Sequence, residues 1–256
     1  MQLTTDDGVR LHVQELGCGP PIVMLHGMFL GNMATWYLTA APVLARRHRV
    51  ILLDMRGHGL SDRARCGYDV ARMTRDLEAV IEQLTREPVT LVGHSYGGVI
   101  ALALALRRPE LVRKLALVET PLPPSQLQEM DAYVGGGLDG GGLDRMLEAF
   151  PSVVREALVG GGRRGRRIAE SIRFLWLESS LPDDVRRAED VPDDQLAALA
   201  CPLLAVYGSR SSCRPAGARL ARLVPGARLV ELPAGHYLPL EAPGPLTEAL
   251  ASFADG

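Results

Sequence analysis

A serine flanked by glycines is the residue of this chain best suited to do chemistry. The surrounding sequence, Gly93-His94-Ser95-Tyr96-Gly97-Gly98, follows one apolar run and precedes another. A serine between a strand and a helix is held on a sharp, strained turn that exposes its hydroxyl, and small neighbours let the two elements pass closely. We therefore predict that Ser95 is a nucleophile. A glycine-rich turn that happens to contain a serine is the alternative.

A serine hydroxyl needs a base to accept its proton, and a neutral histidine suits that role near pH 7. His236 is the best of the six histidines, because Gly235-His236-Tyr237 follows the last predicted strand and precedes the final predicted helix. His94 lies beside Ser95 within the turn and cannot easily reach round to its hydroxyl. We predict His236 as the base.

Attack by Ser95 on an acyl group would create an oxyanion, which two N–H donors must stabilise. The sequence His26-Gly27-Met28 follows directly after a buried strand. The backbone N–H groups of Met28 and Tyr96 are the predicted pair of donors. The alternative is that His26 and Gly27 only close a tight turn.

Short apolar runs alternate with helical patterns along the chain. The predicted strands cover residues 10–16, 21–25, 50–54, 89–93, 115–119, 203–207 and 228–232. The predicted helices cover residues 35–46, 70–84, 96–107, 216–223 and 245–253. Strands buried on both faces that alternate with helices predict an α/β fold, with a mostly parallel sheet covered by helices on both faces.

This alternation breaks between about residues 120 and 200, where helical patterns occur without strands, for example over residues 143–158 and 168–177. We predict that residues 1–119 and 201–256 form the core domain. Residues 120–200 would then be a helical cap, inserted after the strand that ends at Glu119.

Taken together, these motifs resemble the α/β-hydrolase fold superfamily, and within it the single-cap group of esterases, epoxide hydrolases, haloperoxidases and C–C hydrolases. The matching features are His26-Gly27, Asp54-Met55-Arg56-Gly57-His58-Gly59, the turn around Ser95, and Gly235-His236. They follow the chain order of the family and cover about residues 8–254. The resemblance implies an eight-stranded sheet with a helical cap, and a structural role for the turn at Asp54. A serine at position 95, where epoxide hydrolases and dehalogenases use aspartate, argues against those two activities.

The acid of a catalytic triad is absent from the place that the resemblance implies. In this family the acid usually follows the strand that ends here at Gly208, yet residues 208–230 contain no Asp or Glu, and Ser211 occupies the expected position. Glu119 is the predicted replacement, because it ends the preceding strand and some family members take their acid there. Alternatively, Glu119 binds backbone at the root of the cap, and Ser95 and His236 act as a dyad helped by the Ser211 hydroxyl.

We expect the cap and the loop after His26 to line an apolar substrate pocket. The predicted lining residues are His26, Phe29, Phe150, Trp176 and Tyr237, with ordinary core packing as the alternative for each. Such a pocket favours an acyl or polyketide-like substrate over a sugar or a nucleotide. An arginine cluster could attract an acidic carrier protein or a carboxylated substrate, although charge runs are more often solvated helix ends; its members are Arg163, Arg164, Arg166 and Arg167.

Three functions agree with these features. The leading hypothesis is a serine hydrolase that cleaves an ester or thioester through an acyl-enzyme. A second is a specialised biosynthetic lyase or cyclase that uses the pair of Ser95 and His236 for elimination or rearrangement. A third is a non-catalytic ligand receptor, since a fold alone does not define a function.

Composition narrows the classes of partner. The 28 basic and 30 acidic residues nearly cancel, which gives no reason to expect nucleic acid. The N-terminus lacks the pattern of a secretion signal, and the longest apolar run, residues 99–106, is too short to span a bilayer. We therefore expect a cytoplasmic monomer or homodimer that acts on a small molecule, free or carrier-bound, without a membrane partner. The cysteines and histidines show no metal-ligand spacing, so we expect free thiols and neither metal nor cofactor.

Overall fold

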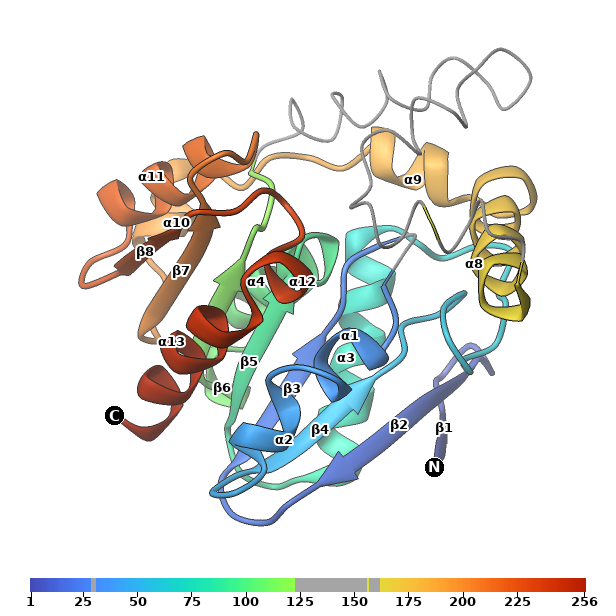
Figure 1. Ribbon diagram of the computed structural model, residues 1–256, viewed down its shortest axis with the longest axis horizontal. Helices are drawn as coiled ribbons and strands as arrows, with labels where there is room; N and C mark the ends of the chain where they lie inside the picture. The colour runs from blue at the N-terminus through green and yellow to red at the C-terminus, as the bar shows by residue number, and fades with distance from the viewer. Residues whose placement is uncertain (29–30, 123–155, 157–161) are drawn as a thin grey trace.

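The computed structural model describes residues 1–28, 31–122, 156 and 162–256. Within them, eight strands form one sheet (Figure 1). In chain order these strands are β1 (Gln2–Thr4), β2 (Arg10–Leu16), β3 (Pro21–Leu25), β4 (Arg49–Leu53), β5 (Val89–His94), β6 (Val112–Val118), β7 (Leu203–Gly208) and β8 (Arg228–Leu232). Seven of the eight were predicted. The strand that prediction missed, β1, has three residues and buries only Leu3, so its periodic pattern is too short to detect.

The strands lie in the order β1-β2-β4-β3-β5-β6-β7-β8. β1 and β2 are antiparallel to their neighbours, and all later pairs are parallel. This confirms the predicted mostly parallel, eight-stranded sheet. The order places β3, β5, β6 and β7 side by side, so the loops that follow their carboxyl ends meet at one edge of the sheet.

Helices cover both faces of the sheet, as predicted (Figure 1). Their bounds are α1 (Ala34–Tyr37), α2 (Ala41–Leu44), α3 (Val70–Leu84), α4 (Tyr96–Arg107), α11 (Arg214–Leu223), α12 (Leu238–Glu241) and α13 (Pro243–Asp255), with a 3₁₀ turn η1 (Pro109–Leu111) before β6. α3, α4 and α11 pack on one face, and α1, α2, α12 and α13 on the other. In β3 the side chains of Val23 and Leu25 point to the first face and those of Ile22 and Met24 to the second, which is the alternation of a strand buried on both sides.

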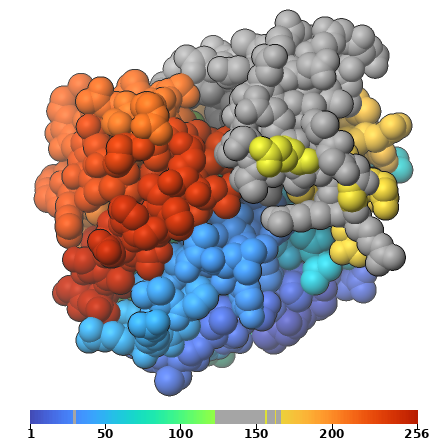
Figure 2. Space-filling view, in the orientation of Figure 1, coloured from blue at the N-terminus to red at the C-terminus, as the bar shows by residue number. Residues whose placement is uncertain are grey.

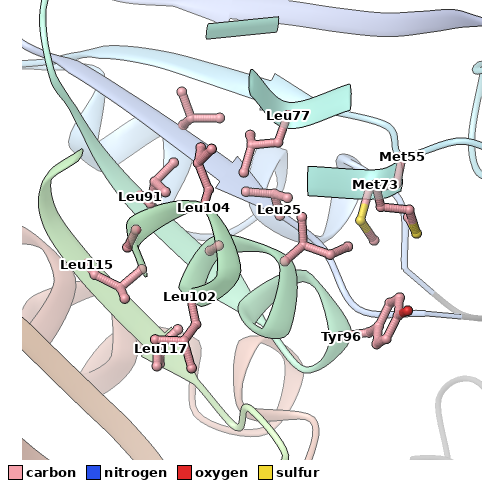
Figure 3. Close-up of a cluster of buried hydrophobic side chains, with 14 of the residues drawn as sticks. Leu25, Met55, Met73, Leu77, Leu91, Tyr96, Leu102, Leu104, Leu115 and Leu117 are labelled. Carbon is pink, nitrogen blue, oxygen red and sulfur yellow. The ribbon is translucent and has the colours of Figure 1, made fainter. Parts of the chain in front are cut away.

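The cluster between the sheet and helices α3 and α4 supports the turn at Ser95. In Figure 3, leucines of β3, β5 and β6 lie against Met73 and Leu77 of α3 and against Leu102 and Leu104 of α4. Burying one such side chain fully contributes about 1.5–3 kcal/mol. The strand before Ser95 and the helix after it are therefore both held by one continuous core.

One predicted helix, over residues 35–46, is divided in the structure. It appears as α1 and α2, separated at residues 38–40. Pro42 has no N–H group, and its ring conflicts with the carbonyl four residues earlier, so a continuous helix cannot run through it. The Thr39 hydroxyl also donates a hydrogen bond to the carbonyl of Thr35 at 2.6 Å, closing α1 locally.

Among the described residues from 162 to 202, four helical segments lie between β6 and β7, consistent with the predicted cap insertion. They are α8 (Arg163–Arg173), the π-helix η2 (Phe174–Glu178), α9 (Leu181–Arg186) and α10 (Asp193–Ala197). The predicted helix over residues 143–158 lies outside the described residues, apart from residue 156. Leu175 of η2 is fully buried and packs toward Tyr68 and Gly57, which joins this insertion to the turn after β4.

The last two helices of the chain, α12 and α13, pack against its first two, α1 and α2. Figure 2 shows the red C-terminal segment beside lighter blue segments of the N-terminal part. Trp36 of α1 and Leu44 of α2 belong to the same buried cluster as Leu238 of α12 and Leu246 of α13. Within the described part of the chain, no helix is both long and apolar enough to cross a membrane.

Candidate active site

Ser95 occupies a strained turn between β5 and α4. Its backbone angles are φ 52° and ψ −124°, a conformation that costs a non-glycine residue about 1–3 kcal/mol. The Ser95 N–H donates a hydrogen bond to the carbonyl of Val118 at 2.9 Å, which fixes the turn to β6. A Cβ at Gly97 would collide with the carbonyl of His26, and one at Gly93 would lie 2.5 Å from Gly98 Cα. The glycines are therefore required by the close passage of strand, helix and loop.

His236 lies in the segment between β8 and α12, and its Nε2 atom is 3.0 Å from the Ser95 hydroxyl. The structure thus brings together the predicted nucleophile and base. His94 holds this segment in place, because its Nε2–H donates to the carbonyl of His236 at 3.0 Å. Burial lowers the pKa of His94 to about 3, so its ring is neutral and serves only as a buried hydrogen-bond donor at this contact.

Glu119 directly follows β6 and is fully buried. Its Oε2 atom lies 3.2 Å from Nδ1 of His236, on the opposite side of the imidazole from Ser95. Its Oε1 accepts the Gly208 N–H, and its Oε2 also accepts the Ser211 hydroxyl. The carboxylate therefore has a hydrogen-bond donor on each oxygen besides the imidazole, which is what keeps a buried charge stable.

Ser211, which the dyad alternative invoked as a helper of Ser95 and His236, contacts the carboxylate of Glu119. It lies after β7, at the place where the resemblance implied an acid, and its hydroxyl donates a hydrogen bond to Glu119 Oε2. The side chains of Glu119 and Ser211 thus meet behind His236 from two neighbouring strands. A hydroxyl here orients the carboxylate and has no negative charge of its own to offer the imidazole.

The pKa of His236 reflects opposing effects. Burial alone would lower the pKa of His236, but the contacts with Cys213 and Glu119 outweigh it and raise the pKa above its ordinary value. A raised pKa means that the imidazolium form is stabilised. This is the form that His236 would adopt on taking the proton of Ser95.

The predicted oxyanion donors remain available. Gly27 lies against the serine, because a Cβ added to it would be 3.1 Å from Ser95 Cβ. Tyr96 begins α4, so its N–H is one of the helix-terminal groups that have no partner within the helix. Among the residues that the structure describes, neither the Met28 nor the Tyr96 N–H has a hydrogen-bond acceptor.

Of the predicted pocket residues, the structure places Tyr237 against the site and Trp176 on the insertion between β6 and β7. The ring of Tyr237 meets the ring of His236 edge-on, with centroids 5.4 Å apart, and Trp176 is half-buried on η2. His26, also predicted to line the pocket, is instead fully buried and structural. Its Nε2 accepts the Met55 N–H at 3.1 Å, and its Nδ1 is 2.7 Å from its neighbour's carbonyl. The remaining two, Phe29 and Phe150, lie outside the described residues.

The turn after β4 is structural, as the resemblance implied. Asp54 accepts the N–H of Met33 at 2.7 Å and that of Leu60 at 3.0 Å, so its carboxylate joins the segment before α1 to its own turn. Burial lowers the pKa of His58 to about 3, and the ring nitrogen Nδ1 binds the carbonyl of Arg56. Both oxygens of Asp54 are thus used within the fold, whereas Nε2 of His58 is buried and has no hydrogen-bond partner among the described residues.

Sequence reasoning missed one residue of the site. Cys213, between β7 and α11, places its sulfur 3.6 Å from Nδ1 of His236. Within the described residues, Glu119, Cys213 and His236 form a group whose potential ligand atoms all lie within 4.8 Å of one another. No local spacing could reveal this group, because its members come from three separate segments of the chain.

The chain was compared with known proteins. A family model described as alpha/beta hydrolase fold matches residues 20–161. An uncharacterized protein of Mycobacterium tuberculosis is 30% identical over 198 residues, which cover 77% of this chain and 56% of that protein. The chain therefore spans little more than half the length of this relative.

Other matches extend over nearly the whole chain. The 2-(acetamidomethylene)succinate hydrolase of Mesorhizobium japonicum is 28% identical over 263 residues, which cover 96% of this chain and 92% of that enzyme. The crystal structure of a hydrolase from Pseudomonas aeruginosa superimposes with a TM-score of 0.80 at 26% identity, over 100% of this chain and 98% of the other.

Proposed function

Because the chain belongs to the α/β-hydrolase fold family of enzymes, we propose that it is a serine hydrolase with Ser95, His236 and Glu119 as its catalytic triad. The substrate that we propose is an ester or thioester of an apolar small organic molecule. The observation that carries this proposal is the continuous path from the Ser95 hydroxyl through both nitrogens of His236 to Glu119 Oε2, with gaps of 3.0 and 3.2 Å.

In the first half of the proposed reaction, His236 Nε2 removes the proton of Ser95 as its oxygen attacks the acyl carbon. The fully buried carboxylate of Glu119 keeps the proton of the neutral ring on Nδ1, so that Nε2 can act as the acceptor. The charge that develops on the acyl oxygen is held by the N–H groups of Met28 and Tyr96. The imidazolium then protonates the leaving alcohol or thiol.

In the second half, water takes the place of the leaving group. His236 removes a proton from the water, whose oxygen attacks the acyl-enzyme, and the imidazolium returns the proton to Ser95. The same two N–H groups hold the second oxyanion. The proton transfers use the pair of Ser95 Oγ and His236 Nε2, which lie 3.0 Å apart.

The nature of the substrate is inferred from the surroundings of the triad. Tyr237 presents an aromatic ring against His236, and Trp176 presents one on the insertion between β6 and β7. Met28 adds an apolar side chain at the loop after β3. Apolar walls with a few polar groups at the reacting end suit an acyl group better than a sugar. The similarity to a 2-(acetamidomethylene)succinate hydrolase supports a hydrolytic reaction.

The test is covalent labelling with a fluorophosphonate, followed by turnover of p-nitrophenyl esters and acyl thioesters of increasing chain length. We expect one label per chain, on Ser95, and loss of both labelling and turnover in Ser95→Ala and His236→Ala. Asp193→Asn, in the exposed ion pair with Arg219, is the matched control and should label like the wild type. Labelling without turnover of any ester would favour the lyase or cyclase, and no labelling of folded protein would favour the receptor.

A further inference from the structure

The proposed catalytic histidine and two side chains behind it have the chemistry of metal ligands. Glu119 offers a carboxylate oxygen, Cys213 a sulfur and His236 its Nδ1 nitrogen, and these atoms lie within 4.8 Å of one another. Glu119 is fully buried and Cys213 is 6% exposed, whereas the side chain of His236 is 29% exposed. His236 is thus the most exposed of the three ligands, and the other two are enclosed.

The two distances from the imidazole nitrogen to the other ligand atoms match edges of a zinc coordination shell, and the carboxylate and sulfur atoms lie within 4.8 Å of each other. With bonds of about 2.0 Å to nitrogen and oxygen and about 2.3 Å to sulfur at tetrahedral angles, the N···O edge is about 3.3 Å and the N···S edge about 3.5 Å. In the structure, Nδ1 of His236 is 3.2 Å from Glu119 Oε2 and 3.6 Å from Cys213 Sγ. Both edges are thus within about 0.1 Å of tetrahedral values before any side chain moves.

We propose that Glu119, Cys213 and His236 form an inhibitory site for Zn²⁺, with water in the fourth position. The mixture of thiolate, imidazole and carboxylate suits zinc, whereas Mg²⁺ prefers oxygen ligands alone. Binding forms a Zn–S bond and releases the thiol proton of Cys213 to solvent. It needs no oxidant or other reactant.

The expected inhibition follows from the tautomer of His236. A metal on Nδ1 uses that lone pair, so the single ring proton must reside on Nε2. Nε2 then donates toward Ser95 and cannot accept its proton. This consequence rests on the proposed function, but the binding of the ion does not.

The first measurement is binding of zinc chloride by equilibrium dialysis to the full chain, with wild type, Ser95→Ala, Cys213→Ala and Cys201→Ala compared. We expect wild type, Ser95→Ala and Cys201→Ala to bind one zinc ion more than Cys213→Ala does. Cys201 is a free, partly buried cysteine two residues before β7, so it controls for general loss of a thiol. Equal zinc binding by Cys213→Ala and wild type would overturn the proposal, and so would the absence of any zinc bound to folded wild type.

The second measurement is the zinc concentration that halves fluorophosphonate labelling or ester turnover, each variant being compared with its own rate in EDTA. Loss of one direct ligand should raise that concentration at least about tenfold in Cys213→Ala, and leave it unchanged in Cys201→Ala. MgCl₂ at the same concentrations should not inhibit. Inhibition that is equal in Cys213→Ala and wild type would refute the site. If wild type binds zinc at Cys213 but is neither labelled nor active without metal, the proposed function fails while the zinc site stands.

Discussion

Replacing Glu119 by glutamine would separate the charge of this side chain from its shape. The carboxylate accepts three hydrogens, from the Gly208 N–H, the Ser211 hydroxyl and the imidazole. A glutamine amide has only one oxygen with which to accept them. If that oxygen stays on Gly208, the amide NH₂ faces Nδ1 of His236 and moves the ring proton to Nε2. If the amide is flipped, the buried Gly208 N–H is unpaired, which costs about 1–3 kcal/mol.

The first arrangement is the less costly for the fold and the more harmful for the proposed reaction. Holding the imidazole in the wrong tautomer lowers turnover about 10⁴-fold in a well-studied serine protease, equivalent to about 5 kcal/mol of transition-state stabilisation. We expect kcat to fall by about 10³–10⁴-fold in Glu119→Gln. KM should change little, because the side chain is fully buried behind the imidazole and faces away from Ser95.

The pH dependence adds a second readout. In the wild type the pKa of His236 is raised, so the neutral base becomes available, and kcat/KM rises, as the pH increases through that raised value. Glutamine removes a negative charge that favours the imidazolium, so the pKa falls and the rise begins at a lower pH. Simple damage to the site would instead lower the plateau of the pH profile without moving its midpoint.

The assay is steady-state hydrolysis of a p-nitrophenyl ester between pH 5 and 11, corrected for the spontaneous rate, with thermal unfolding to verify the fold. Glu231→Gln is the control, because that carboxylate pairs with Arg214 on the exposed side of β8 and should leave kcat unchanged. A Glu119→Gln variant that keeps kcat within about tenfold of the wild type, with an unshifted midpoint, would contradict the triad. The pair of Ser95 and His236 would then be sufficient without an acid.

Three further substitutions test the supports of the site. Ser211→Ala removes one donor to Glu119 and should lower kcat about three- to tenfold, with unchanged KM, in the same ester assay. Gly97→Ala drives a Cβ into the carbonyl of His26 and should lower the free energy of unfolding by about 1–3 kcal/mol in a urea titration. Arg56→Met removes one partner of the buried carboxylate of Asp76 and should lower the free energy of unfolding by about 3–5 kcal/mol in that titration. A decrease of less than about 1 kcal/mol would refute the importance of the buried pair.

Local patterns predicted the parts of the molecule that local physics decides. β2, β3 and β8, and helices α3 and α4, begin and end where the periodicity indicated. Ser95 and His236 were identified because each sits in a short string of residues whose meaning depends on the strand before it and the helix after it. The predicted helix over residues 35–46 was interrupted because a single proline outweighed a favourable apolar pattern.

The contacts behind His236 could not be predicted in this way. Glu119 was proposed from its place at the end of the preceding strand and from the resemblance, but its hydrogen bond from Ser211 joins residues 92 positions apart and was not foreseen. Cys213 carried no signal at all, since its approach to the imidazole depends on the conformation of the segment after β7. Such contacts are set by the sheet order and by loop conformation, to which neither composition nor periodicity is sensitive.

Glu119 directly follows β6, and Ser95 directly follows β5, the neighbouring strand of the sheet. β5 and β6 are paired along their length, and the Ser95 N–H is itself bonded to the carbonyl of Val118, one residue before Glu119. The distance between the backbones of Ser95 and Glu119 is therefore set by the pairing of two strands and not by a loop. The segment after β7 does not have to position the acid. Insertions in this segment should therefore be tolerated as long as one hydroxyl still donates a hydrogen bond to the carboxylate of Glu119.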